Sequence, residues 1–444
     1  MKAPATGLLH WAFPALLLVG AANVATSGRD LTQSYSDLQA LVEPMRLPWV
    51  VWFQRAVSLL LLVAALEQTV NHMALKRRTP SLALLSAFLV FWAGTIGASA
   101  LFGAHPQVSH DLLYALAMGT ASCLVNPTER DRILRAARDT LLALMLVGLA
   151  IIALRPTLVL DPSYNAGLLQ NVPRFAGLTS HAVTQGSLAQ VATLLLWALP
   201  YPRPWMNRTA WALTLGVLVM AQSKAAWIAF AVCLGAMAAT RHGAALWRRI
   251  GDPRSGALGL VVLASLGLVV SAMAVGLIVG DAAGRIGLFL ESPEGARLAT
   301  MTGRDRIWAI AAEEWRNHPV FGYGLTLWDA LYRARVDLPN ATHAHNQFMD
   351  DAARSGTVGV VALVIYATTL LVLSVRYARV TAGLSIALFL SLALRAISEV
   401  PLTLLGYGSE LFVHLALLVT LAAAAASEPA PAPRTATLRY GVVP

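Results

Sequence analysis

The amino-acid sequence predicts an all-α protein that crosses a membrane many times. Two observations carry this prediction. The chain of 444 residues is 57% hydrophobic and only 13% charged, and its mean hydropathy is +0.62. A soluble domain cannot bury that much apolar surface, whereas long apolar runs separated by short charged clusters are typical of polytopic membrane proteins.

Apolar runs long enough to cross a bilayer recur along the whole chain. A crossing helix needs about 20 residues, so we expect about 12 spans. The first run resembles a signal peptide, but His10 and Pro14 interrupt it and similar runs follow, so we interpret it as a membrane helix. The expected spans are 6–25, 48–67, 82–103, 109–125, 140–154, 185–200, 209–222, 225–240, 257–280, 356–375, 380–396 and 406–426.

These spans divide the chain into four regions. Residues 1–280 hold the first nine spans with short loops, 281–355 form one long helical segment outside the membrane, and 356–426 hold the last three spans. The Pro/Ala-rich tail, 427–444, is expected to be disordered. Cys123 and Cys233 lie within apolar runs, so no disulfide framework is expected.

Basic residues fall in alternate loops, which predicts the orientation. Cytoplasmic loops of membrane proteins carry an excess of Lys and Arg. Both termini are therefore expected in the cytoplasm, and the loop at 155–185, the turn at Lys224, the segment 281–355 and the loop at 395–405 on the opposite face. The alternate basic loops hold Lys76, Arg77, Arg78, Arg130, Arg132, Arg135, Arg138, Arg203, Arg208, Arg241, Arg248, Arg249, Arg254, Arg376 and Arg379.

Four cations on the outer face have no role in setting orientation. Arg174 precedes the sixth span, Lys224 lies in a tight turn, and Arg304 and Arg306 lie in "MTGRDRIW". Each alone is readily explained by a lipid headgroup contact or a structural ion pair. Together, in glycine-flanked loops, they favour a site for an anion, and Arg is well suited to phosphate oxygens.

A cluster of polar residues stands at the mouth of the tenth span, in "ATHAHNQFMDDAARSGTVG". A neutral imidazole is a suitable general base at neutral pH, which makes His345 a candidate, although a lone histidine is more often structural. Asp350 and Asp351 could orient it or cap the following helix. His343, His345 and an aspartate could alternatively bind a metal ion, but this spacing is not diagnostic of one.

Other residues of the outer face have weaker signals. Gly356 and Gly359 are expected to allow close packing at the start of the tenth span. His181 and Gln185, after Arg174, are secondary candidates for substrate contact. Arg395 and Glu399 are expected to pair with each other, and Arg55 within the second span needs a partner that the sequence does not identify.

Several classes of function are disfavoured. The sequence contains no phosphate-binding P-loop, no dinucleotide-binding fingerprint and no Ser-centred nucleophile elbow. The net charge of +10 is explained by cytoplasmic loops, so no nucleic-acid partner is expected.

One family resemblance is specific. "HNQFMDDAARSGTVG" fits His-[Asn/Ser/Gln]-x9-Gly-x-x-Gly, with His345, Asn346, Gly356 and Gly359 at the fixed places. This pattern resembles that of bacterial O-antigen ligases and the related O-antigen polymerases. "RFAGL", starting at Arg174, is similar to the ligases' Arg-x-x-x-Leu element, and "TGRDRIW" followed by "HPVFGYG" is similar to the segment before their catalytic histidine. The motifs cover about 174–360, whereas the span layout covers the whole chain.

The resemblance implies a ligase of lipopolysaccharide assembly, with a glycosyltransferase-C-like fold, in the bacterial inner membrane and with a periplasmic site. Such an enzyme moves a glycan from undecaprenyl diphosphate to a sugar hydroxyl of the lipid A–core, without a cofactor, ATP or metal. His345 would activate the acceptor, and Arg174 and Arg304 would bind the diphosphate, with Arg306 beside them. Lys224 departs from the family's Ser-Arg pair and loses its forked geometry.

The chemistry of these residues agrees with that role. A departing diphosphate builds negative charge that fixed cations can stabilise, and a sugar hydroxyl needs a base. Direct displacement would invert the anomeric centre. Three alternatives stay open: an O-antigen polymerase using the same donor, a protein O-oligosaccharyltransferase, whose outer domain is usually larger, and a lipid-linked glycan transporter. A transporter would place its charges near the midplane of the membrane.

Overall fold

The structure is a computed structural model of the whole chain, and it describes residues 7–33, 47–162, 169, 171–251 and 304–428, with the backbone alone for 244–251. The predicted ninth span, part of the long segment (281–303) and most of the tail lie outside the described residues.

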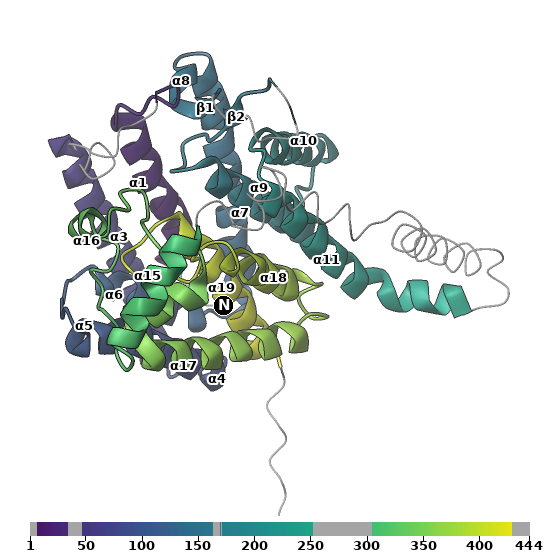
Figure 1. Cartoon of the computed structure of the whole chain (residues 1–444). Coiled ribbons are helices and arrows are strands. Elements are labelled where there is room, and N and C mark those ends of the chain that lie inside the picture. The colour runs from purple at the N-terminus through teal and green to yellow at the C-terminus, as the bar shows by residue number, and fades with distance from the viewer. Residues whose placement is uncertain (1–6, 34–46, 163–168, 170, 252–303, 429–444) are drawn as a thin grey trace, which may run out of the picture.

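The described chain is a bundle of helices (Figure 1). Two short strands, β1 (Leu160–Asp161) and β2 (Arg174–Phe175), pair antiparallel, with Asp161 opposite Arg174. Short helical elements are η1 (Leu8–Trp11), the π-helical η2 (Ala93–Gly97), α5 (Ala98–Phe102), α8 (Pro156–Val159) and α16 (Ala330–Arg335). The longer helices are α1 (Ala12–Thr26), α3 (Pro48–Ala74), α4 (Leu82–Trp92), α6 (Leu112–Cys123), α7 (Pro127–Ile152), α9 (Ala182–Ala198), α10 (Pro204–Met220), α11 (Lys224–Gly251), α15 (Arg304–Asn317), α17 (Gln347–Arg376), α18 (Leu384–Ala396) and α19 (Ser409–Ala426).

The described chain is mostly helical, as predicted, whereas the predicted number of spans is not confirmed. Six helices of the described chain are long and apolar enough to cross a membrane, and α6 and α18 are shorter apolar helices. Each predicted span other than 257–280 coincides at least partly with a helix. The six begin and end at Leu8–Thr26, Pro48–Ala74, Leu82–Phe102, Lys224–Gly243, Gln347–Arg376 and Ser409–Ala426.

Local sequence explains where several helices begin. Pro48 and Pro127 occupy first-turn positions, where proline costs no hydrogen bond. Asn126 and Glu129 form a capping box at the start of α7. Cys123 and Cys233 are buried as free thiols.

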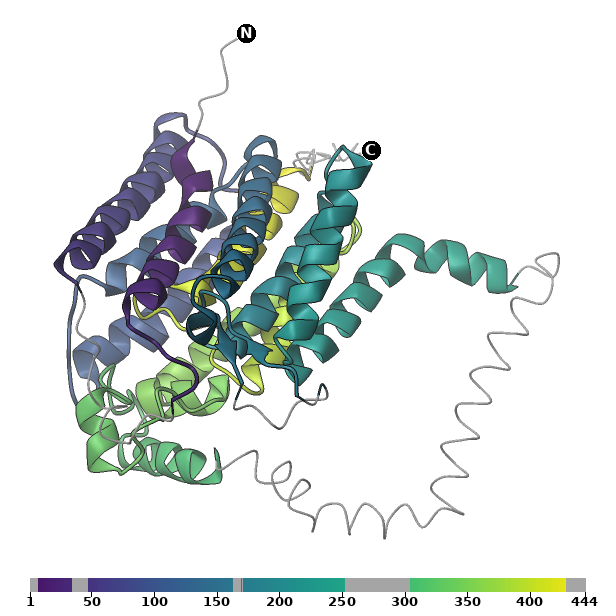
Figure 2. The ribbon, with the colours of Figure 1, turned by 90° about the horizontal axis from the view of Figure 1, so that it is seen from above.

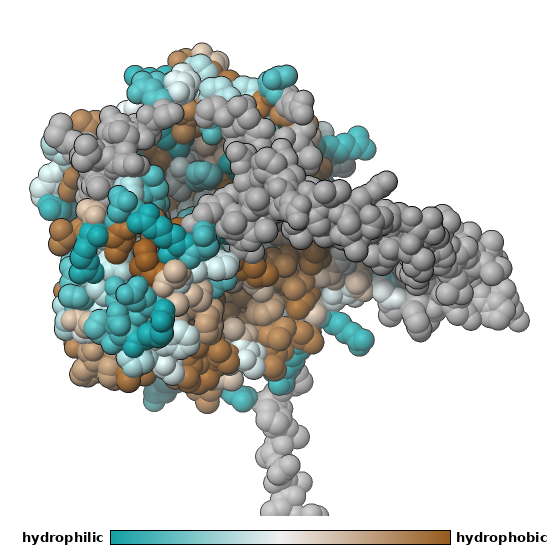
Figure 3. All heavy atoms as spheres, viewed as in Figure 1, coloured by the Kyte–Doolittle hydropathy of each residue, from teal (hydrophilic) through white to brown (hydrophobic). Residues whose placement is uncertain are grey.

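The core of the bundle surrounds α19. This helix is buried along nearly its whole length and contacts α1, α6, α7 and α18. Apolar side chains from these neighbours form one continuous core. Figure 3 shows hydrophobic side chains over α17 and α18 and hydrophilic ones over α15 and α16.

The chain from α15 to the start of α17 forms a second, smaller core at one end of the bundle. Ala311, Trp328, Tyr332, Ala344 and Ala353 are buried together in it. Figure 2 shows α15 and α16 (green) at this end. At the other end, Arg77 and Arg78 line a cavity with the start of α7 and the ends of α17 and α19. This separation agrees with the alternation of basic loops in the sequence.

Gly356 produces a break within α17 that joins this smaller core to the bundle. Its φ of 64° and ψ of −160° are non-helical and favour glycine. The segment 319–324 runs beside the break, where Thr357 N donates to Pro319 O (2.8 Å) and Tyr323 N to Ala353 O (2.9 Å). A Cβ at Gly356 would lie 2.5 Å from the carbonyl of Val320. The expected close approach therefore involves this segment's backbone.

Gly359 serves a different contact. A Cβ there would lie 2.3 Å from the Cβ of Ser355, whose hydroxyl donates to Thr95 O (2.7 Å) in η2. Gly359 thus leaves room for the side chain that ties α17 to η2.

We predict that Gly356→Ala lowers the free energy of unfolding by about 1–3 kcal/mol or more, because it combines backbone strain with a clash. Thermal unfolding of purified protein in detergent measures the effect. The control is Gly216→Ala in α10, where a new Cβ meets nothing within 4 Å, so its stability should stay within about 1 kcal/mol of wild type. Equal melting temperatures for both variants would contradict the argument.

Candidate active site

A cavity of about 850 Å³ opens at the end of the bundle that carries α15 and α16. Four parts of the chain line it: the start of α9, the start of α15, the loop before α17 with its first turns, and the connection from α18 to α19. The lining residues are Ser180, His181, Val183, Thr184, Arg304, Asn340, Thr342, His343, His345, Asp350, Arg354, Arg395, Glu399, Val400, Thr403, Leu405 and Glu410.

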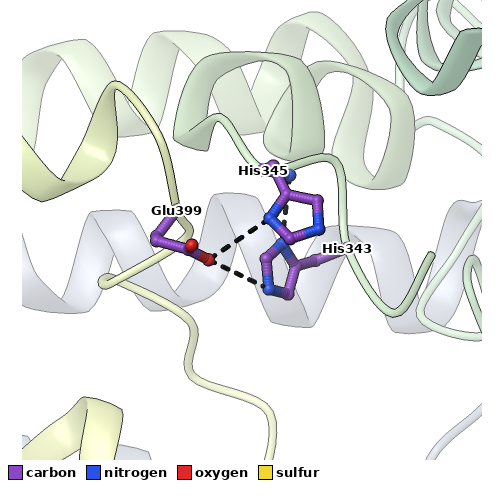
Figure 4. A group of neighbouring side chains, drawn as sticks. All are labelled: His343, His345 and Glu399. Carbon is purple, nitrogen blue, oxygen red and sulfur yellow. Dashed lines mark hydrogen bonds and ion pairs between the residues drawn. The ribbon is translucent and has the colours of Figure 1, made fainter. Parts of the chain in front are cut away.

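Two histidines and a carboxylate meet in this cavity (Figure 4). His343 Nε2 lies 3.3 Å from Glu399 Oε2, and His345 Nδ1 lies 3.4 Å from the same oxygen. The imidazole rings are 4.1 Å apart between centroids. All three side chains are partly buried, with 17–29% of each exposed. We call these three residues the histidine–glutamate cluster.

One hydrogen bond assigns the position of the ring proton of His343. The backbone N–H of His345 donates to His343 Nδ1 (3.0 Å), so the ring proton of a neutral His343 is on Nε2 and faces Glu399. His345 Nδ1 is buried, lies 3.4 Å from Glu399 Oε2 and makes no hydrogen bond of good geometry. A proton on Nδ1 leaves a lone pair on Nε2 of His345.

Burial and charge act together on the cluster. Burial chiefly, with the adjacent His345, lowers the pKa of His343 to about 4, so this ring is neutral at neutral pH. Burial alone would raise the pKa of Glu399, but contact with His345 and the charges of His343, His345 and Arg395 outweigh it and lower that pKa. The cluster therefore holds an ionised carboxylate beside two imidazoles.

The loop that carries both histidines is fixed at Ala344. Its N–H donates to Asp350 Oδ1 (2.9 Å), and its carbonyl accepts from Trp308 Nε1 (2.9 Å) of α15. Asp350 is buried and also accepts from Trp328 Nε1 (3.0 Å) and Arg354 Nε (3.2 Å). His343 and His345 thus flank a clamped residue. His345 itself has a φ of 50°, an uncommon conformation for a non-glycine residue that suits a functional site.

Asn346 and Gln347 hold the loop that carries Glu399. Asn346 caps α17 by accepting from Met349 N (3.1 Å), and its Nδ2 donates to Ile397 O (3.2 Å). Gln347 Oε1 accepts from Leu402 N (2.9 Å), while its Nε2 donates to Asp351 (3.0 Å). The two amides therefore hold the backbone of this loop on both sides of Glu399, at Ile397 and at Leu402.

Arg395 does not pair with Glu399 as the sequence suggested. It makes a forked ion pair with Glu410, at 2.8 and 2.7 Å. The two residues meet only through the backbone, where Glu399 N donates to Arg395 O (2.8 Å). Glu399 is consequently available to the histidines. Arg55, also left without a partner by the sequence, stacks over Trp52.

The structure separates the two arginines of "GRDRIW". Arg304 lines the cavity and forms no ion pair with any residue in the described part of the chain. Arg306 points elsewhere: it donates to Val336 O (3.0 Å) and lies 3.7 Å from Asp337. Arg304 is thus the better placed of the two to meet an anion in the cavity.

The remaining predicted residues lie around the cavity or farther away. Arg174 is buried in β2, and its Nε donates to Ala221 O (2.9 Å). His181 lines the cavity and caps α9; burial, then the charge of Arg174, lowers its pKa. Gln185 is buried and does not line the cavity. Lys224 is exposed at the start of α11 and does not line the cavity.

The histidine–glutamate cluster has the composition of a metal site, since its three ligand atoms lie within 4.8 Å of one another. A metal ion on His343 Nε2 would displace the proton from that nitrogen onto Nδ1, where it would oppose the N–H of His345. Metal binding would therefore break a bond that holds the loop. The arrangement favours a hydrogen-bonded cluster over a metal centre.

Sequence reasoning did not assign Glu399, Trp308 and Arg354 to this site. Glu399 is more than 50 residues from His345 in the sequence, and its motif "ISEVP" has no distinctive spacing. A buried Arg354 in the first turns of α17, four residues after Asp350, was a detectable signal, because i,i+4 pairs face each other on a helix.

Comparison with known proteins bears on the identity of this site. Residues 209–364 match the family model described as O-antigen ligase. This match supports the O-antigen ligase and polymerase superfamily. The match contains Lys224, Arg304, His343, His345 and Gly356, and it ends before Glu399. No curated protein matches the chain.

The match confirms the resemblance that the sequence motifs indicated, and with it the general class of protein. Its members are O-antigen ligases or polymerases, which are glycosyltransferase-like enzymes acting on lipid-linked glycans. Together with the apolar helices, it describes a multi-pass membrane protein.

The lowered pKa of His343 predicts a pH dependence of stability. The pKa of this histidine is 6.5 in the unfolded chain and about 4 in the folded chain. At a pH between these two values, His343 binds a proton in the unfolded chain but not in the folded chain. The stability is therefore fully present above pH 6.5 and decreases as the pH falls. From pH 7.5 to 4.5, wild type should lose on the order of 2 kcal/mol more than His343→Gln.

Thermal unfolding across this pH range checks the prediction. The control, His318→Gln, replaces a histidine at the end of the α15 segment that does not line the cavity, and should follow wild type. Parallel curves for wild type and His343→Gln would contradict the burial of a neutral ring.

Proposed function

We propose that the protein is an O-antigen ligase of the bacterial inner membrane, with its cavity on the periplasmic face and both termini in the cytoplasm. It transfers a glycan from undecaprenyl diphosphate to a sugar hydroxyl of the lipid A–core. The observation that carries the proposal is the cluster geometry: Glu399 Oε2 lies 3.4 Å from His345 Nδ1, which leaves Nε2 to act as a base in a cavity that Arg304 also lines.

The base acts on the acceptor. His345 Nε2 takes the proton of the sugar hydroxyl as the hydroxyl oxygen attacks the anomeric carbon, and the imidazolium that forms is stabilised by Glu399. This division of roles, with a carboxylate on one ring nitrogen and the reacting proton on the other, is how histidine bases are oriented in unrelated enzymes. A positioned base of this kind contributes about 10²- to 10⁴-fold in rate.

The cations act on the leaving group. The bond from the anomeric carbon to the diphosphate oxygen breaks as the new glycosidic bond forms, and charge accumulates on the diphosphate. Arg304 at the cavity wall meets that charge, and Arg174 adds positive potential near His181. Lys224 and Arg306 lie outside the cavity lining, so any contribution they make to donor binding is a longer-range one.

The carboxylates of the cavity support inversion. Asp350 bonds Arg354, Glu410 bonds Arg395, and Glu399 contacts both histidines. Each is engaged by a positive or hydrogen-bonding partner. A retaining mechanism would need a carboxylate nucleophile directed at the sugar. Direct displacement by the acceptor requires none.

Transfer by purified protein tests the proposal. In detergent with EDTA, an undecaprenyl-diphosphate glycan is offered together with lipid A–core, and the products are resolved by gel and mass spectrometry. Wild type should place glycan on the lipid core with inverted anomeric configuration. His345→Ala should lose at least about 10²-fold in rate. Longer carrier-linked glycan as the sole product would replace the ligase with a polymerase, and a fully active His345→Ala would refute the assigned base.

The two neighbouring arginines give a matched test of diphosphate binding. Arg304→Ala should lower kcat/KM by roughly 10- to 1000-fold, because a fixed charge is lost where negative charge develops. Arg306→Ala removes a cation two residues away that faces Val336 and Asp337, and should stay within a few-fold of wild type. Initial rates at varied donor concentration decide this, and equal losses would argue against a specific role for Arg304.

A further inference from the structure

His343 is adjacent to the proposed base but is not the base. Its Nδ1 accepts the backbone N–H of His345 (3.0 Å), and its Nε2 faces Glu399 (3.3 Å). Both ring nitrogens are therefore occupied, and no lone pair remains to take a substrate proton. The ring nevertheless lines the cavity, so its place in the site needs another explanation.

The contacts of the cluster form a closed ring. The backbone of His345 binds His343, the side chain of His343 binds Glu399, and Glu399 contacts the side chain of His345. We propose that His343 is a positioning residue, which holds the backbone of His345 at its left-handed conformation and holds Glu399 where it receives the proton of His345 Nδ1. The proposal rests on the assignment of His345 as the base.

Geometry explains why a histidine suits this position. A φ of 50° at His345 is strained, and the hydrogen bond from the same residue's N–H to His343 compensates that strain. In the same loop, side chains also fix the backbone of Ala344, through Asp350 and Trp308. An imidazole offers an acceptor and a donor on opposite sides of one rigid ring, which lets one side chain serve the loop and Glu399 at once.

Two amide variants separate these two roles. In His343→Asn, the short side-chain oxygen can replace Nδ1 and accept the N–H of His345, but nothing reaches Glu399. In His343→Gln, the longer amide can replace Nε2 and donate to Glu399, while the backbone N–H loses its partner. His343→Ala loses both. His318→Gln, outside the cavity, controls for the loss of an imidazole.

The inference predicts a change in turnover without a change in binding. His343→Ala should lower kcat of transfer by roughly 10- to 100-fold, the range typical of residues that orient a reacting group. The KM values for donor and acceptor should stay within about 3-fold. His343→Asn and His343→Gln should each recover part of the loss, and His318→Gln should match wild type.

Several outcomes would overturn the inference. Wild-type kcat in His343→Ala, with His345→Ala inactive, would show that His343 does not position the base. Losses as complete as that of His345→Ala in all three His343 variants would make it a reacting group. A raised KM with unchanged kcat would make it a substrate contact.

A second measurement is independent of transfer. In protein labelled with ¹⁵N-histidine, wild type should show His345 as the neutral tautomer with its proton on Nδ1, and His343 with its proton on Nε2. His343→Ala should convert the His345 signal to a mixture of tautomers. If His343→Ala left the His345 signal unchanged, the positioning role would be refuted, whatever reaction the protein catalyses. If the tautomers were as expected but wild type transferred no glycan, only the proposed function would be refuted.

Discussion

The shape of the cavity depends on the hydrogen bonds that the buried carboxylate of Asp350 accepts. It accepts from the backbone of Ala344, from Trp328 and from Arg354, so it joins the histidine loop, the small core below α16 and the first turns of α17. Arg354 in turn donates to Leu325 O and Leu327 O. Removing one partner of a buried charge typically lowers the stability of the fold by about 3–5 kcal/mol. The loss of any one of these contacts is therefore expected to weaken the others.

This dependence explains the polar stretch that precedes a membrane helix. In the proposed reaction His345 is the base; Asn346 and Gln347 hold the opposite loop, Asp350 holds the histidine loop, and Asp351 accepts from Gln347. The smaller core buries Ala344 of the histidine loop and Ala353 of α17, but the side chains of the cluster also need to be held rigidly. The neighbouring polar residues supply that rigidity, which a preorganised site requires.

The sequence predicted the parts that depend on local pattern. Apolar runs located helices such as α3 and α17, and the spacing from His345 to Gly359 indicated the superfamily. Contacts between distant segments were not readable. Nothing local shows that Glu399 turns toward the histidines while Arg395 turns to Glu410, or that Arg304 faces the cavity and Arg306 does not. Which side chains meet in such cases depends on the angles at which helices cross and on the residues at which they end.

The attachment of His345 to α17 has a geometric consequence. The helix that begins two residues after the histidine continues past the break at Gly356 to Arg376, as one of the helices suited to cross the membrane. Close backbone contacts at Val320 and Gly322 fix the angle of that break. The imidazole is therefore held at a fixed position relative to the apolar part of α17. In the proposed reaction, the acceptor hydroxyl has to reach the base at that position, so the break at Gly356 sets where the two lipid-linked substrates must meet.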